Sequence, residues 1–215
     1  MRRTQAGFGL LEAMLALAMG LMVLTAASQL LVASHQAWRL QGAALRLQDD
    51  ARLALLRMAQ DVRMAGMFGC LQLRPDDIKD PLARQALAQP LLIGPSSLEL
   101  VVAETSAYTG KPDWTLFTDC RKKAVVSDLP PAHFGEHMAF RLSRHRYELR
   151  DSTLYFVWGR STQPLIEHVR QMQVTHEKTP GAGRIDIALT LFEPTLQLEQ
   201  RHEISIALRN LGADS

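Results

Sequence analysis

Glu12 is the side chain whose position most suggests chemistry, because it interrupts an otherwise apolar stretch. It is the only ionisable residue between Phe8 and Val32, and all other residues of that run are apolar, small or neutral. An unpaired charge inside a membrane costs a few kcal/mol, so an acidic residue at such a place is a functional residue by default. We therefore take Glu12 as a candidate functional residue.

Two histidines four residues apart, His133 and His137, could share one helix face and bind a metal ion. The segment is not an H-E-x-x-H motif, it contains Gly135, it follows two prolines, and no third ligand is evident. We expect surface histidines there and no metal site. The chain also lacks a G-x-S-x-G motif, a Walker A loop and a G-x-G-x-x-G motif, so we expect neither an enzyme nor a bound cofactor.

Basic residues cluster at 121–123 and at 141–146, where they could contact the phosphates of a nucleic acid. The chain as a whole has 24 Lys and Arg against 22 Asp and Glu, a formal net charge of +2. No aromatic platform accompanies the clusters, so we expect a solvated face or a protein contact and no nucleic-acid partner. The hydrophobic content of 47% excludes a disordered polyelectrolyte.

The elements that position these residues are indicated by an uneven distribution of proline and charge. All ten prolines lie at or after Pro75, so the chain before it can form a continuous helix. The apolar run 8–32 would rise about 37 Å as a helix, enough to cross a hydrocarbon core of about 30 Å. Arg2 and Arg3 precede the run, which predicts a cytoplasmic N-terminus and export of the remainder.

A cleaved signal peptide and a plain single-pass anchor are the ordinary alternative interpretations of this apolar run, and neither explains Glu12.

An amphipathic pattern follows the apolar run and predicts that the helix continues to Gly66, which would end it. Its apolar residues recur three or four apart: Leu40, Ala44, Leu47, Ala51, Leu55, Met58, Val62 and Ala65. Charged residues alternate with this stripe. Arg57 and Asp61, four residues apart, are expected to form a pair on the solvated face.

The start of the chain resembles the class III signal of type IV prepilins, in which G-F-x-x-x-E follows a short basic leader and precedes an apolar helix. Gly7, Phe8 and Glu12 match this signal. The resemblance implies cleavage between Gly7 and Phe8 by a membrane-embedded prepilin peptidase, followed by N-methylation of Phe8. It also implies that Glu12 pairs with the N-terminal amine of a neighbouring subunit. Two such buried charges offset each other's desolvation only when they are docked.

A second segment resembles minor pilins of the PilW type. Residues 48–70 fit the pattern Q-x-x-A-R-x-A…D-[IV]-R-x-A-G-x-x-G-C, and residues 206–211 resemble the last strand of those proteins. The apolar helix also lacks the proline that major pilins usually carry, which favours a minor subunit.

The two resemblances together imply an α+β fold, a type IV pilin-like lollipop with a long N-terminal helix packed on an antiparallel sheet. Its parts would be a leader at 1–7, a transmembrane or filament-core helix at 8–32, an amphipathic helix at 33–66 and a periplasmic β-rich head at 67–215. The chain would lie in the inner membrane with its N-terminus in the cytoplasm. Its partners would be other minor pilins, the major pilin, the prepilin peptidase, the inner-membrane assembly platform and the lipid bilayer.

Alternating patterns bounded by turn residues predict the strands of the head. Strands are expected at 97–104, 114–118, 145–150, 153–158, 184–192 and 201–208. Asp151-Ser152 and residues 180–183 are expected to form turns. Residues 165–174 fit a helix or a strand equally, and residues 75–95 are expected to form a connecting loop.

Cys70 and Cys120 are the two cysteines of the chain. If the head is exported, an oxidising compartment favours a disulfide between them, and the alternative is two buried, reduced thiols. The disulfide would close a loop of roughly 50 residues, a stabilisation of about 4 kcal/mol, and attach the end of the long helix to the sheet.

Three functions are consistent with these features. The first is a minor pilin that helps to initiate or assemble a type IV pilus. The second is a minor pseudopilin of a type II secretion system, which has the same signal and the same design. The third is an exported binding domain on a single membrane anchor.

Overall fold

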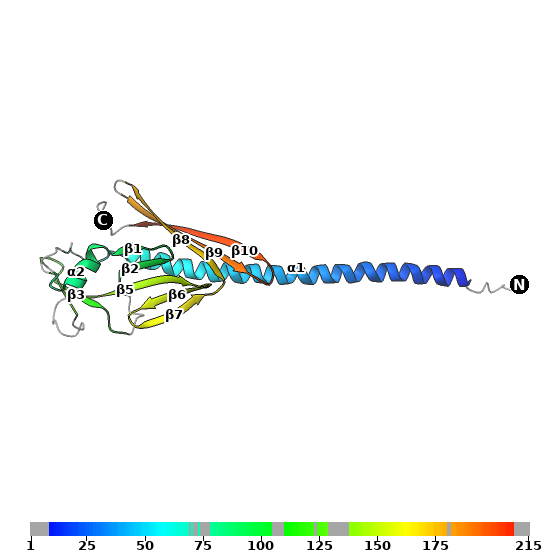
Figure 1. Ribbon diagram of the computed structural model, residues 1–215, viewed down its shortest axis with the longest axis horizontal. Coiled ribbons are helices and arrows are strands. Elements are labelled where there is room, and N and C mark those ends of the chain that lie inside the picture. Colours follow the sequence, from blue (N-terminus) through cyan, green and yellow to red (C-terminus); the bar gives the residue numbers. More distant parts are fainter. Residues whose placement is uncertain are drawn as a thin grey trace. The chain divides into compact units, whose positions relative to one another are not determined.

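The computed structural model describes residues 9–68, 70, 73, 78–104, 110–122, 124–128, 138–179 and 182–208. Within these residues the chain forms two helices and ten strands (Figure 1). It divides into two compact units between Leu45 and Arg46. The fold is α+β, with a long N-terminal helix whose second part packs on antiparallel sheets.

The long helix, α1 (Leu10–Met64), continues without interruption for 55 residues, as the absence of proline predicted. At its start, the carbonyl of Gly9 accepts hydrogen bonds from the backbone N–H groups of Glu12 and Ala13 at 3.0 and 3.2 Å. At its end, Ala65 forms a bridge with Val102, and Gly66 has a φ of 72°. Only glycine adopts this left-handed conformation without steric cost, so Gly66 ends the helix.

The larger sheet contains seven antiparallel strands in the order β1-β2-β5-β3-β4, with β6 paired to β5 and β7 paired to β6. Its strands are β1 (Leu91–Ile93), β2 (Ser97–Ala103), β3 (Trp114–Thr118), β4 (Ala124–Ser127), β5 (Met138–Arg150), β6 (Thr153–Trp158) and β7 (Ser161–Ile166). Leu142 of β5 pairs with Ala103 on one side and Trp114 on the other. The long strand β5 therefore holds the sheet together.

The smaller sheet contains three antiparallel strands in the order β10-β9-β8. They are β8 (Val169–Thr179), β9 (Ala182–Glu193) and β10 (Leu198–Leu208). One face of β9 is apolar and buried, through Ile185, Ile187, Leu189 and Leu191. The undecided segment 165–174 is extended, since it contains the end of β7 and the start of β8.

The main hydrophobic core lies where the second part of α1 meets both sheets. The expected apolar stripe is confirmed from Leu47 to Ala65, all of whose members are buried, whereas Leu40 is exposed. Ala54 and Ala59 are buried as well, so the buried arc of the helix is wider than the stripe.

The expectation of a loop at 75–95 is wrong, because the segment contains a short helix, α2 (Pro81–Ala88), and the strand β1. Asp80 caps the helix, with its carboxylate accepting the N–H groups of Leu82 and Ala83 at 3.0 and 3.2 Å, and Pro81 occupies the first turn. A smaller core, which includes Leu87, Val101 and Trp114, covers the buried side of α2.

Candidate functional site

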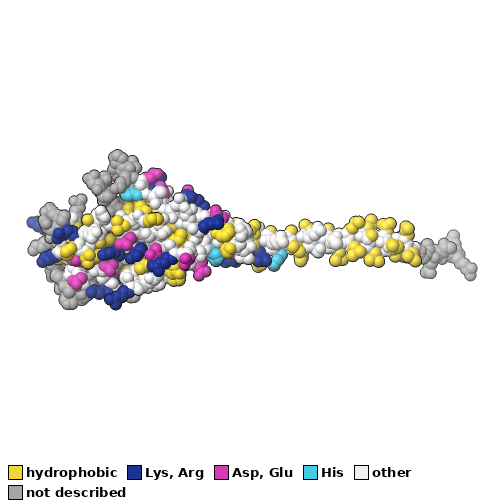
Figure 2. Space-filling view, in the orientation of Figure 1, with side chains coloured by type: hydrophobic (Ala, Val, Ile, Leu, Met, Phe, Trp, Pro, Cys, Tyr) yellow, Lys and Arg dark blue, Asp and Glu magenta, His cyan; other side chains and the backbone are white. Residues whose placement is uncertain are grey.

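The first part of α1 exposes an apolar surface over its whole circumference. From Leu10 to Val32 its large apolar side chains are 51–83% exposed, and Figure 2 shows them gathered along this stretch. The most apolar window of 18 residues has a mean hydropathy of 2.1 and no residue buried within the chain, so the helix is long and apolar enough to cross a membrane. Because soluble surfaces rarely carry such patches, this surface is built to contact lipid or other apolar helices.

Glu12 lies in the first turn of α1 within that apolar surface. It shares one open, shallow helix face with Leu11, Leu15, Ala16 and Met19. Within the described parts of the chain its carboxylate has no ion-pair partner. Glu12 is exposed, as are the apolar side chains around it. Of the other expected site residues, Gly7 and Phe8 lie outside the described residues.

A buried polar cluster attaches α1 to the larger sheet. Asp61 of α1 contacts two residues of β5 through one carboxylate oxygen, Oδ2, which lies 2.7 Å from Nδ1 of His145 and accepts the phenol hydrogen of Tyr147 at 2.6 Å. All three residues are buried. Burial first, and then the Asp61 carboxylate, raise the pKa of Tyr147 well above its ordinary range, so the phenol stays neutral and donates.

The expectation that Arg57 and Asp61 lie on a solvated face is therefore wrong. Asp61 is buried, and Arg57 is half-buried with its guanidinium carbon 4.2 Å from the centre of the Phe156 ring in β6. The same ring meets His145 edge-on, with 5.0 Å between the ring centres. The buried side of the helix is wide enough to include these polar residues. Opposite charges four residues apart have the same spacing in the sequence whether they lie on a solvated helix face or under a sheet.

Sequence reasoning also missed a second buried carboxylate, that of Glu104, next to β2. It accepts hydrogen bonds from Arg141 Nε and Trp158 Nε1, each at 2.8 Å, and from the hydroxyl of Ser143. The side chain of Glu104 is fully buried, and these donors compensate its desolvation. Part of the basic cluster at 141–146 thus serves the interior of the head.

The two cysteines form a disulfide, as expected, with 5.3 Å between the Cα atoms of Cys70 and Cys120. The bond joins the segment that follows α1 to the turn between β3 and β4. In that turn the carboxylate of Asp119 accepts the N–H groups of Arg121 and Lys122, each at 2.9 Å. The chain after α1 is thereby tied covalently to the larger sheet.

We expect no metal site at His133 and His137. The structure does not test this expectation, because both histidines lie outside the described residues. In the parts of the chain that the structure describes, no group of three or more His, Cys, Asp or Glu side chains could hold a metal ion.

Comparison of the chain with protein-family models, with curated proteins and with solved structures finds no match.

Proposed function

We propose that the chain is a minor pilin, a subunit that helps to initiate or assemble a type IV pilus at the inner membrane. The observation that carries the proposal is a single carboxylate, Glu12, in the first turn of an exposed apolar helix. Its place after Gly7 and Phe8 matches the prepilin signal. A type IV pilin-like lollipop, with the head outside the membrane, is part of this proposal.

The proposed mechanism follows from the cost of burying charge. In lipid, the Glu12 carboxylate lacks a partner and is destabilised by a few kcal/mol. Cleavage between Gly7 and Phe8 would create a positively charged N-terminal amine on each subunit. The amine of one subunit could then pair with Glu12 of its neighbour. Docking the two opposite charges compensates both desolvation penalties, so subunits would add laterally and in register. The chain itself performs no chemistry in this mechanism.

The export of the head is supported by two features. Arg2 and Arg3 precede the apolar run, which favours a cytoplasmic N-terminus. The disulfide between Cys70 and Cys120 is suited to an oxidising compartment such as the periplasm.

The first test is the mass of the mature chain in cells with an active prepilin peptidase. We expect a chain that begins at N-methylated Phe8, and we expect Gly7→Val to retain residues 1–7. A wild-type chain that still contains residues 1–7 would contradict the proposal.

The second test compares three Glu12 variants for their presence in sheared pili. Glu12→Gln keeps the size but removes the charge, and we expect it to be processed yet lost from pili. Glu12→Asp keeps the charge and should restore part of the incorporation, while Thr25→Val on the same helix should have no effect. Full incorporation of Glu12→Gln would contradict the charge-pair mechanism. Deletion that stops exoprotein secretion but leaves surface pili would favour the pseudopilin.

A further inference from the structure

Three polar or amphipathic side chains gather on one face of α1 just beyond its apolar run. They are His35, Trp38 and Arg39, which share a face because residues three and four apart are neighbours on a helix. All three are exposed, and Trp38 is 71% exposed although it is a large aromatic residue. The ring centres of His35 and Trp38 are 6.3 Å apart. This face combines an amphipathic ring with a positive charge and is open to a molecule outside the chain.

The position of this face along the helix matches the headgroup layer of a bilayer. The Cα atoms of His35, Trp38 and Arg39 lie about 4.5, 9 and 10.5 Å beyond the last residue of the apolar run, Val32, along the helix axis. The hydrocarbon core is about 30 Å thick and the whole bilayer about 40–45 Å, which leaves a polar layer of about 5–8 Å on each side. Helical side chains lean toward the N-terminus, so the long side chains of Trp38 and Arg39 extend back toward the apolar run. When that run occupies the hydrocarbon core, all three side chains reach the headgroup layer.

The charge of Arg39 has no counterpart on its part of the helix. Arg39 is the only Lys or Arg between Leu10 and Leu45, and the next acidic residue along α1 is Asp49, ten residues further on. Within the described ranges of the chain no ion pair involves Arg39. An exposed arginine without a carboxylate is available to an anion outside the chain. Lipid phosphate is the anion that lies next to an apolar membrane span.

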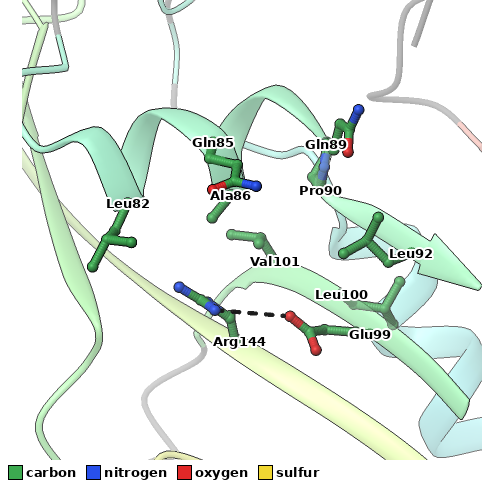
Figure 3. A pocket seen from close by; sticks show the side chains of 10 residues that line it. All are labelled: Leu82, Gln85, Ala86, Gln89, Pro90, Leu92, Glu99, Leu100, Val101 and Arg144. Carbon is green, nitrogen blue, oxygen red and sulfur yellow. Dashed lines mark ion pairs between the residues drawn. The ribbon is translucent and has the colours of Figure 1, made fainter.

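The arginines of the larger sheet differ from Arg39 in this respect. All four arginines of β5 form ion pairs within the head. In the groove between α2 and the strands β1, β2 and β5, for example, Arg144 Nη1 lies 4.0 Å from a carboxylate oxygen of Glu99, and both side chains line the groove (Figure 3). The charges of the groove therefore balance each other, whereas the described residues do not balance the charge of Arg39.

We propose that His35, Trp38 and Arg39 bind phospholipid headgroups of the periplasmic leaflet, with a preference for anionic lipids, and thereby set the depth of α1 in the membrane. Arg39 donates N–H groups to a lipid phosphate. Trp38 places its ring among the upper acyl carbons and directs Nε1–H to the ester and phosphate oxygens. His35 supplies a further ring N–H. The inference rests on the proposed membrane anchor and adds the lipid contact that ends it.

The depth of Trp38 is measured by fluorescence quenching in the full chain, in nanodiscs of phosphatidylcholine and phosphatidylglycerol. The lipids carry bromine on the acyl chains, either near the glycerol or near the chain ends. Trp114 and Trp158 also fluoresce, so the signal of Trp38 is the difference between the wild type and Trp38→Phe. We expect bromine near the glycerol to quench this signal at least about twofold more than bromine near the chain ends. Equal quenching, stronger quenching from the chain ends, or none would overturn the proposal.

A second tryptophan position separates this proposal from the membrane anchor itself. Leu21→Trp, made in the Trp38→Phe chain, places a tryptophan near the middle of the apolar run at an exposed position. We expect bromine near the chain ends to quench it more strongly. If Leu21→Trp is quenched in this way and Trp38 is not quenched, the anchor holds and the headgroup contact is wrong. If neither tryptophan is quenched, α1 does not enter the bilayer and the proposed anchor fails as well.

Charge variants test the choice of lipid. In nanodiscs of the same overall composition, either the phosphatidylglycerol or the phosphatidylcholine carries the bromine near the glycerol. We expect the anionic lipid, per molecule, to quench wild-type Trp38 at least about twofold more, because Arg39 attracts it. Arg39→Gln should remove this preference, and Arg52→Gln, at an exposed position thirteen residues further along α1, is the matched control that should keep it. A preference that survives Arg39→Gln, or that the wild type lacks, would contradict the contact between Arg39 and lipid phosphate.

Discussion

Replacement of Asp61 by alanine is expected to weaken the attachment of α1 to the head strongly. The wild-type carboxylate accepts hydrogen bonds from His145 and Tyr147 at 2.7 and 2.6 Å. The variant removes this acceptor from two residues that stay buried. A buried donor that loses its partner costs about 1–3 kcal/mol, and two such donors correspond to about 2–6 kcal/mol.

The expected loss of about 2–6 kcal/mol is a large part of the roughly 5–15 kcal/mol by which a domain is stable. Tyr147→Phe removes a single bond to a charged acceptor and should cost about 1.5–3 kcal/mol. Since the two residues share one interaction, the double variant should lose less than the sum of the single losses.

The measurement is urea unfolding of the full chain in nanodiscs, followed by near-ultraviolet circular dichroism, which reports the packed aromatic residues of the head. Asp50→Ala is the matched control, because Asp50 is exposed on the same helix and its loss should change the unfolding free energy by less than about 0.5 kcal/mol. If Asp61→Ala costs no more than Asp50→Ala, the argument from burial is refuted. Additive losses of Asp61→Ala and Tyr147→Phe would refute the shared hydrogen bond.

Two further predictions concern pH and the disulfide. The raised pKa of Tyr147 means that the unfolded chain ionises first, above its ordinary pKa of about 10, so stability should fall there by about 1.4 kcal/mol per pH unit. Tyr147→Phe should lack this part of the slope in unfolding measurements from about pH 9 to 11, and equal slopes would contradict it. A double Cys70→Ser and Cys120→Ser variant opens a loop with a sequence separation of 50 and should lose about 4 kcal/mol in urea unfolding; a loss below about 1 kcal/mol would show that the unfolded chain gains little freedom.

The long helix was predictable because its determinants are local. The absence of proline before Pro75 permits it, the apolar run and the stripe from Leu47 mark its faces, and Gly66 ends it. The expected strands were also found, since alternation and turn residues act over a few neighbours. The sequence does not predict α2, because residues 75–95 are rich in Pro, Asp and Gln, a composition typical of loops, although Asp80-Pro81 is a usual start for a helix.

The polar interior could not be predicted in the same way. Asp61 meets His145 and Tyr147, which are 84 and 86 residues further along the chain, and Glu104 meets Trp158 across 54 residues. Asp61 and Glu104 have the sequence context of surface residues. Their burial depends on which strands cover them, which no local pattern contains.

The sequence by itself thus determined an apolar helix with one acidic residue in its first turn, a β-rich remainder and two cysteines able to pair. Helical periodicity, strand alternation and membrane-scale hydropathy are properties of neighbouring residues, so they are visible without a fold. Only the tertiary structure decided that Asp61 and Glu104 are interior and that α2, β1 and β5 enclose a groove beside Arg144. Burial and concavity arise when distant segments pack against each other, and the partners of a side chain exist only after that packing.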